Sequence, residues 1–502
     1  MSELPPGWEW ANLEDLAGPT VRAITDGPFG SNLKSEHYTE SGARVIRLQN
    51  IGDGQFRDER TYISLERFES LRNHEVREGD LIVASLGETP PRACLVPALG
   101  EPAIVKADCI RIRLSSQVDA RWVLYALTSP QAKKFAATLI KGVGRPRLGL
   151  AHIRALRVPV PPLAEQRRVV AEIEHHFSDL DAAERLLDSV DRRTEMAGKS
   201  LLAAALSGKI VDCPARKDVT GDLLRQATLE SRRSFRSDSD KRGRPDASPP
   251  IRQLEFDIPD HWSVVSLEEA THPNRTISYG ILKPGPNLSN GIPYVRVINM
   301  RGDQIATEDL HRTSREIEQK YARARLAPAD VLLSIRGTFG RVAIVPDCLA
   351  DASITQDTAR LSFVDTVDPR FAAYYLRSPG AQSYFKKIAR GVAVKGVNIG
   401  DLREMPMPLP SLTEQQLIVR SLDEFLSEVV AAKDVVQNTQ RRVRQLRKTI
   451  LLEAFAGRLV PQDPNDESAS VLLERIKAER AAQPMPKRGR RVTKNVDQGS
   501  ML

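Results

Sequence analysis

The sequence predicts an α+β protein built as a tandem duplication, in which each copy joins a mixed α/β domain to a long α-helix. Apolar residues recur every three or four positions through 164–206 and again through 413–456, which is the spacing of a coiled-coil seam. The second stretch repeats the first at an offset of 249 residues, because Glu-Gln pairs stand at 165–166 and 414–415. Each helix has one narrow apolar stripe to bury. We therefore expect the two helices to form an antiparallel coiled coil.

The first globular domain is predicted to span 1–163. Short β-rich runs separated by glycines lie at 45–48, 81–84 and 109–114. Residues 120–140 follow with the apolar face of a helix. A proline-spaced segment at 158–162 closes the domain, and its prolines predict a stiff, extended chain that leads into a long spacer helix at 164–210.

The second copy repeats this order after a linker at 211–252 that is predicted to be partly disordered, since Arg232–Pro250 is rich in Ser, Arg, Asp and Pro. Its predicted elements are a domain at 253–411 with β-rich runs at 294–298, 331–335 and 358–363, a helix at 369–389, a proline-spaced segment at 405–410, a second long helix at 412–460, and a tail at 461–502 that includes a short helix. Thr413 and Gln416 predict a capping box at the start of the second long helix, and Gly208 and Gly457 predict where the two helices end.

Length and composition exclude several classes of protein. At 502 residues the chain is too long for one core and suits two to four domains. Lys and Arg exceed Asp and Glu by 73 to 65, a mild basic excess that is compatible with a polyanionic partner. Without an apolar run near 18 residues or a leader-like start, we predict a cytoplasmic protein with no membrane span. The four widely spaced cysteines are predicted to be reduced and mostly buried.

Motifs of enzyme chemistry are missing from the sequence. Gly198-Lys199-Ser200 resembles the end of a phosphate-binding loop, but it lies within the first predicted long helix and lacks the first glycine. There is no Gly-x-Gly-x-x-Gly after a strand, no amino-methyltransferase signature, no His-Glu-x-x-His and no Gly-x-Ser-x-Gly. We therefore predict no catalytic, cofactor-binding or metal-binding residues in this chain.

Basic, glycine-bearing loops stand at corresponding places in the two copies instead. Glycine lets a backbone approach phosphate closely, Arg and Lys neutralise phosphate, and Arg, Asn or Gln can pair with base edges. Any single loop of this kind is as easily a surface turn, but six at matching places favour DNA binding. The candidate DNA-binding residues are Lys34, Arg47, Asn50, Arg92, Arg145 and Arg147 in the first copy and Lys283, Arg296, Asn299, Arg336, Thr338, Arg341, Lys395 and Asn398 in the second.

Taken together, these features resemble the specificity subunit of type I restriction-modification systems. The resemblance covers almost the whole chain: in each copy a proline-spaced segment precedes Glu-Gln and a long helix that closes in Ala-x-x-Gly-Lys or Ala-x-x-Gly-Arg. Segments 27–34, 47–50, 402–415 and 454–461 look like motifs of that family.

The resemblance implies two target recognition domains, each reading one half of a split site in double-stranded DNA, on a subunit that is not itself catalytic. It implies that the two helices set the unread gap and dock two methyltransferase subunits, and that restriction/translocase subunits complete the assembly. The chain would need no cofactor, whereas the methyltransferase would use S-adenosylmethionine and the motor subunit ATP and Mg²⁺. The alternative is a coiled-coil assembly scaffold whose globular domains bind protein, for which duplex DNA affinity should be weak and independent of sequence.

Overall fold

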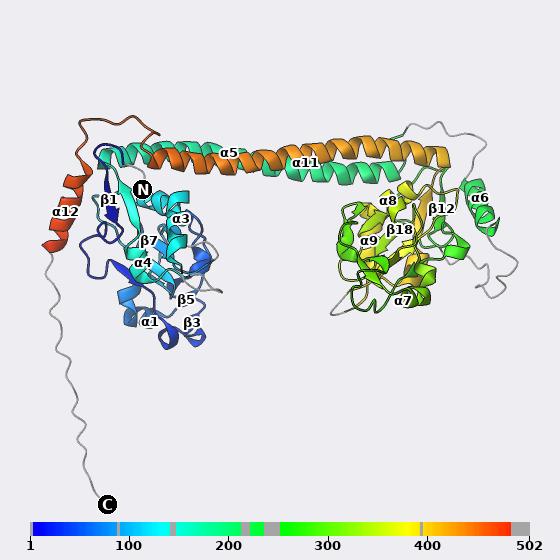
Figure 1. Ribbon diagram of the computed structural model, residues 1–502, viewed down its shortest axis with the longest axis horizontal. Helices are drawn as coiled ribbons and strands as arrows, with labels where there is room; N and C mark the ends of the chain where they lie inside the picture. Colours follow the sequence, from blue (N-terminus) through cyan, green and yellow to red (C-terminus); the bar gives the residue numbers. More distant parts are fainter. Residues whose placement is uncertain are drawn as a thin grey trace, which may run out of the picture. The chain divides into compact units, whose positions relative to one another are not determined.

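The computed structural model describes residues 4–87, 91–140, 147–211, 221–234, 251–391 and 395–482. The chain forms two compact units, one comprising Met1–Leu187 with Asn438–Leu502 and the other Asp188–Gln437. Each unit holds one globular domain and part of both long helices (Figure 1). None of the helices in these ranges is both long and apolar enough to cross a membrane. The mixed helical and strand content confirms the predicted α+β class.

Antiparallel pairing dominates the sheets of the first domain. A ribbon pairs β1 (Glu9–Asn12) with β11 (Arg157–Val160), and a four-stranded sheet has the order β2 (Ile24–Asp26), β10 (Cys109–Ile112), β7 (Leu81–Ala84) and β8 (Arg92–Leu95). A further sheet has the order β3 (Tyr38–Thr39), β5 (Tyr62–Ile63), β4 (Ala43–Ile46), β9 (Ala103–Val105) and β6 (Glu75–Val76), with β4 and β9 parallel. The helices are α1 (Leu65–Ser70), α2 (Ala120–Thr128), α3 (Pro130–Leu139) and α4 (Leu150–Arg154).

The second domain repeats this plan. Its ribbon pairs β12 (Ser263–Ser266) with β22 (Pro406–Leu409), and its four-stranded sheet has the order β13 (Ser278–Tyr279), β21 (Thr358–Leu361), β18 (Val331–Ser334) and β19 (Val342–Ile344). Smaller sheets are formed by β17 (His311–Thr313), β14 (Ile292–Val295) and β20 (Ser353–Ile354), and by β15 (Met300–Arg301) with β16 (Gln304–Ile305). The helices are α7 (Arg315–Lys320), α8 (Pro369–Arg377), α9 (Pro379–Ile388) and α10 (Ile399–Arg403).

Each single helix expected at 120–140 and 369–389 is in fact two helices. The break falls at a Ser-Pro pair in both domains, where the serine hydroxyl accepts a hydrogen bond from the backbone N–H of Ala132 or Ala381 and so caps the second helix. Proline disfavours helical conformation in the residue before it and fits the first turn of a new helix. Apolar periodicity continues across such a break, so the periodicity alone did not predict two separate helices.

The long helices α5 (Leu163–Leu206) and α11 (Leu412–Phe455) begin and end within one residue of the predicted apolar stretches. Gly208 and Gly457 follow them with φ of +70° and +67°, the left-handed conformation that ends many helices. The predicted capping box at Thr413 was wrong, because α11 already includes that residue. The Ser411 hydroxyl instead accepts from the backbone N–H of Glu414, at 3.3 Å.

The two long helices are antiparallel where they meet within the second unit. A Cβ placed on Gly198 would lie 4.0 Å from Leu426. Glu195, which precedes Gly198, has its pKa lowered first by its hydrogen bond to Lys199 and also by the charge of Lys433, which lies further along α11. In the first unit, Arg447 of α11 pairs with Glu184 of α5 at 3.2 Å and lies over the ring of Phe177 at 5.2 Å. The predicted antiparallel arrangement is confirmed within the units, and its coiled-coil packing stays a prediction.

The Glu-Gln pair anchors each long helix to its own domain. In the first, the carboxylate of Glu165 accepts from the indole N–H of Trp8 at 3.0 Å, and Gln166 bridges the backbone N–H of Asp119 and the carbonyl of Pro161. Glu414 and Gln415 make the corresponding bonds to Trp262, Asp368 and Pro410. Buried polar groups need such partners, so these hydrogen bonds give the duplicated Glu-Gln motif a structural role in joining helix to domain.

A short helix after each long helix packs on the domain in the same unit. Figure 1 shows α12 (Ala469–Ala481) beside β1 of the first domain and α6 (Gly221–Ser234) beside β12 of the second. The helix predicted in the tail is thereby confirmed. The whole of α6 lies within the linker predicted at 211–252, and the parts of that linker at 212–220 and 235–250 lie outside the described residues.

Candidate nucleic-acid interface

Four segments of the second domain meet at the end of β18. The backbone N–H of Ile335, which follows β18, donates to the carbonyl of Asp357 at 2.8 Å, and Val397 donates to the carbonyl of Ile335 at 2.8 Å. The loop after β13 joins them, because Ile281 donates to Ile354 at 2.7 Å and Gln356 donates to Ile281 at 2.9 Å. These backbone bonds, which we call the frame, fix the positions from which four loops present their side chains.

A glycine is required where the loop after β13 crosses the frame. A Cβ built on Gly280 would lie 1.8 Å from the carbonyl oxygen of Ile354, which no folded chain tolerates. Gly27 has the same role in the first domain, where a Cβ would lie 2.2 Å from the carbonyl carbon of Lys106. Glycine here allows one backbone to approach another. This corrects the expectation that Gly27 serves close approach to phosphate.

The first domain repeats two of the four bonds of the frame. Ser85, which follows β7, donates its N–H to the carbonyl of Asp108 at 2.9 Å, and Leu148 donates to the carbonyl of Ser85 at 2.8 Å. These are the counterparts of the bonds that join Ile335 to its two neighbours in the second domain. The duplication therefore extends from the sequence to individual backbone hydrogen bonds at the candidate site.

The frame of the second domain surrounds a surface hollow of about 680 Å³. Its lining combines cationic, amide and aromatic groups with apolar ones, from Tyr279, Leu282, Ile335, Arg336, Gln356, Asp357, Arg390, Gly396, Val397, Asn398 and Ile399. Arg390 is 77% exposed and Tyr279 is 40% exposed. Guanidinium, amide and aromatic groups are those that contact phosphates, base edges and base faces.

Charged and amide groups at this hollow already contact one another. The Arg336 guanidinium donates to the side-chain oxygen of Gln356 at 3.5 Å, and Arg390 lies 3.4 Å from a carboxylate oxygen of Asp401. The Asn398 side chain accepts from the backbone N–H of Gly400 at 3.2 Å and so caps α10. The hollow is thus lined by side chains that are held in place before any ligand binds.

The first domain offers a related cluster around Arg147. Its guanidinium pairs with the carboxylate of Asp108 at 2.7 Å and lies over the ring of Phe29 at 5.4 Å. Arg147 is nevertheless half exposed, and Phe29 is 41% exposed. A cation over an aromatic face is held by the ring quadrupole and keeps outward N–H groups for a ligand.

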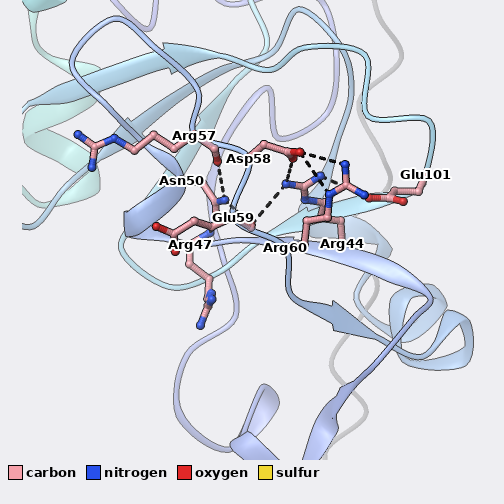
Figure 2. Close-up of polar contacts among 8 residues, drawn as sticks. All are labelled: Arg44, Arg47, Asn50, Arg57, Asp58, Glu59, Arg60 and Glu101. Atoms are coloured by element: carbon pink, nitrogen blue, oxygen red, sulfur yellow. Dashed lines mark hydrogen bonds and ion pairs between the residues drawn. The ribbon is translucent and has the colours of Figure 1, made fainter. Parts of the chain in front are cut away.

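A second candidate region is the 3₁₀ turn at Leu48–Asn50 and its counterpart at Val297–Asn299. Figure 2 shows Asn50 enclosed by the chain, with its amide donating to the carbonyls of Arg57 and Glu59 at 2.9 and 2.7 Å. Its side-chain oxygen accepts from the backbone of Arg47 at 2.9 Å. The side chains of Arg47 and Arg57 extend away from this cluster.

An ion-pair network lies beside the turn in the first domain. The buried Arg44 pairs with Asp58 and with Glu101, the latter at 3.4 Å, as Figure 2 shows. Hydrogen bonds from Arg44, and then from Arg60, hold the pKa of Asp58 below its ordinary value. This network uses its charges internally, so it positions the turn instead of offering a cation to a ligand.

A buried arginine supports the frame from beneath in each domain. Arg360 of β21 donates to the carbonyls of Arg325 and Thr276 at 3.1 and 3.0 Å, and burial lowers its pKa to about 10. Arg111 of β10 bonds the carbonyls of Glu75 and Arg22 in the same way, and burial lowers its pKa too. Arg360 thereby ties the segment before β13 to the sheet, and Arg111 does the same for the segment before β2.

Comparisons with known proteins show which proteins this chain resembles. The family model for the type I restriction modification DNA specificity domain matches residues 259–434. The chain is 26% identical to the EcoBI specificity subunit of Escherichia coli over 92% of this chain and 91% of that protein, and 22% identical to the EcoKI specificity subunit of E. coli strain K12 over 96% and 97%. The chain is thus similar to type I restriction enzyme specificity subunits along most of its length.

The fold of this chain also has a solved counterpart. A chain from work on complex assembly and conformational transition of the type I R-M system superposes with a TM-score of 0.64. It is 20% identical in sequence, and the match covers 91% of the present chain and all of that chain. This likeness concerns the fold alone.

The structure brings several predicted DNA-binding residues of the second domain together. Arg336 and Asn398 line the hollow, Lys283 follows Leu282 of its lining, and the carbonyl of Lys395 accepts from Gly337. Thr338 is exposed in the adjoining turn.

The remaining predicted cations of the second domain already contact other groups of the protein. Arg341 donates to the carbonyls of Val297 and Met300, both at 3.2 Å, and thereby ties the loop after β18 to the second 3₁₀ turn. Arg296 of that turn lies 3.4 Å from the imidazole of His311.

In the first domain, the cations are more scattered. Arg147 and Arg92 flank the loop after β7, and a Cβ on Gly87 would lie 3.7 Å from Arg92. Lys34 is exposed and pairs with Glu36 at 3.6 Å. Arg47 extends from its turn as described, and Arg145 lies outside the described residues.

Two predicted residues require correction. Asn50 is 0% exposed and Asn299 is 6% exposed, and each accepts a hydrogen bond from the backbone of the arginine three residues earlier. Their amides hold the 3₁₀ turn closed and are not available to base edges. A residue type suited to base contacts is equally suited to buried turns, so residue type alone misled the prediction.

Sequence reasoning missed Tyr279, Gln356, Asp357 and Arg390. Arg390 opens a loop that the sequence singled out, so its charge was a usable signal. Tyr279 lies near the consecutive residues Gln356 and Asp357 only because the loop after β13 crosses the frame, and no local sequence pattern predicts this contact between distant segments. Among the described residues, no group of three His, Cys, Asp or Glu side chains could hold a metal ion.

Proposed function

We propose that this chain is the DNA sequence-specificity subunit of a type I restriction-modification enzyme, in which each globular domain reads one half of a bipartite site. Similarity to type I restriction enzyme specificity subunits over most of the chain carries the proposal. The duplicated frame supports it further, because two similar scaffolds with unlike side chains suit the reading of two unlike half-sites. In this proposal α5 and α11 set the unread gap.

The proposed role is recognition without catalysis. Two methyltransferase subunits would dock on the chain and methylate the DNA with S-adenosylmethionine, and restriction/translocase subunits would add ATP- and Mg²⁺-dependent cleavage. Exposed apolar side chains on the long helices, such as Val190 and Val430 at 45% and 58% exposure, offer docking positions for partner helices. The scaffold alternative is not favoured, since the relatives are named for DNA specificity.

A methylation map of host DNA tests the proposal directly. Base modifications across the genome are compared between the host, a strain lacking this gene, and the deletion strain complemented with it. We expect methylation at one split motif, with two defined blocks around a fixed gap, to vanish on deletion and return on complementation. A motif that persists without the gene contradicts the proposal. The scaffold alternative predicts instead that purified complexes bind all duplex sequences equally weakly.

A further inference from the structure

The two domains place an arginine on opposite sides of the same backbone bridge. In the second domain, Arg336 pairs with Gly396 in an isolated antiparallel bridge, and in the first domain Leu86 pairs with Arg147. Leu86 and Arg336 each directly follow the residue whose N–H donates to the aspartate carbonyl of the frame. Arg336 therefore corresponds to Leu86, and Gly396 corresponds to Arg147. The guanidinium therefore comes from opposite partners of the bridge in the two domains, while the backbone bridge itself is the same.

Each arginine is held on one side by a hydrogen-bond acceptor from the same connection. Asp108 accepts from Arg147 at 2.7 Å, and Gln356 accepts from Arg336 at 3.5 Å. Asp108 and Gln356 lie at the segment that precedes β10 and β21, respectively. A guanidinium has five N–H donors in a fixed plane, so one that is steadied by an acceptor keeps an outward edge for a second partner.

Nearby carboxylates argue against a phosphate as that partner. Asp108 directly neutralises Arg147, and Asp357 lines the same hollow as Arg336. A carboxylate weakens the attraction of an arginine for phosphate but leaves its hydrogen-bonding edge intact. The partner that matches such an edge is the O6 and N7 acceptor pair of guanine in the major groove.

We propose that Arg336 and Arg147 each read a guanine, one in each half-site, and that Gln356 and Asp108 are the positioning residues that orient them. The inference rests on the proposed function and adds the base and the residues that read it. The swap across the bridge shifts the guanidinium relative to an unchanged frame, so the guanine should occupy a different place in each half-site.

Selection from a randomised duplex library tests this inference. The full-length chain, purified from its host with the subunits that accompany it, is compared with Arg336→Ala and Arg147→Ala variants. We expect each variant to lose preference for guanine at one position of one half-site by roughly 5- to 100-fold, and to keep the other half-site unchanged. Arg370→Ala is the matched control, because Arg370 is an exposed arginine of the same domain that pairs with Asp423, away from the hollow.

The positioning role has its own readout. Gln356→Ala should lower guanine preference at the position that Arg336 reads, and Gln356→Glu should retain it, because the carboxylate keeps an acceptor. Uniform weakening of all sequences with a smaller salt dependence would identify a phosphate contact and overturn the inference. Unchanged selection by Arg336→Ala would overturn it as well. If the unaltered protein selects no split motif, the proposed function itself fails, and that outcome is seen before any variant is compared.

Discussion

Substituting Gly280 with alanine should open the frame of the second domain without altering the first. The added Cβ would lie 1.8 Å from the carbonyl oxygen of Ile354 and 2.7 Å from its Cγ1, so the two backbone segments must separate. Separation removes the bonds of Ile281 to Ile354 and of Gln356 to Ile281, and that of Gly280 to Thr355 at 3.2 Å. At about 0.5–1.5 kcal/mol for each net hydrogen bond, the local loss is about 2–4 kcal/mol.

Hydrogen–deuterium exchange measures this loss where it occurs. A local destabilisation of about 2–4 kcal/mol should speed exchange of the Ile281 and Gln356 amides by roughly 30- to 700-fold. Gly400→Ala is the control, because a Cβ there meets nothing closer than 3.9 Å and the residue lies in α10. If Gly280→Ala exchanges at these amides no faster than the control, the required close approach is refuted. Half-site selection should fail only for the second domain.

The remaining predictions concern the long helices and the thiols. Leu422→Asp buries a carboxylate at a 0% exposed position of α11 and should lower the free energy of unfolding by about 3–5 kcal/mol. Val430→Asp, at a 58% exposed position, should change the free energy of unfolding by under about 0.5 kcal/mol. Equal midpoints of urea unfolding for the two variants would contradict this. Deleting one heptad from both long helices shortens each by about 10 Å. The unread gap should then change by up to about three base pairs, while both half-sites stay the same. If the methylated motif keeps its original gap, the spacing role is refuted. Burial raises the pKa of Cys94 and of Cys109 to about 12, so iodoacetamide at pH 8 should label the exposed Cys348 and spare both, as peptide mass spectrometry will show. Because these thiols ionise first in the unfolded chain, stability should fall as pH rises from about 9 toward 12, and equal labelling of all three would contradict the assignment.

Features that depend on local pattern could be predicted from the sequence. The apolar stretches at 164–206 and 413–456 agree with α5 and α11 within one residue, because a stripe that repeats over some forty positions is hard to mistake, whereas the helix ends predicted at 210 and 460 were four and five residues too late. The Glu-Gln pair was recognised as a marker of the duplication, but its role in anchoring Trp8 and Trp262 depends on contacts about 150 residues apart. The Ser129-Pro130 break was present as a signal and was overlooked, because the apolar face continues across it.

Candidate site residues were predictable only where charge and exposure coincide. Arg336 and Arg147 lie on glycine-bearing loops, and both are exposed enough to meet a ligand. Asn50 is on an equally suggestive motif, yet the fold uses its whole amide internally. Burial is decided by the crossing of distant segments, so the sequence did not distinguish a base-contact residue from a residue that closes a turn.

The frame also explains how one fold can serve two unlike half-sites. Its hydrogen bonds join backbone to backbone, so the side chains that face outward from it can change without removing any of them. The positions with the least freedom are Gly27 and Gly280, where the backbones touch, and the buried Arg111 and Arg360, whose guanidinium groups donate to backbone carbonyls. A guanidinium can therefore move to the other side of the bridge at little cost in stability, and a domain of this design can acquire a new half-site by surface substitutions alone.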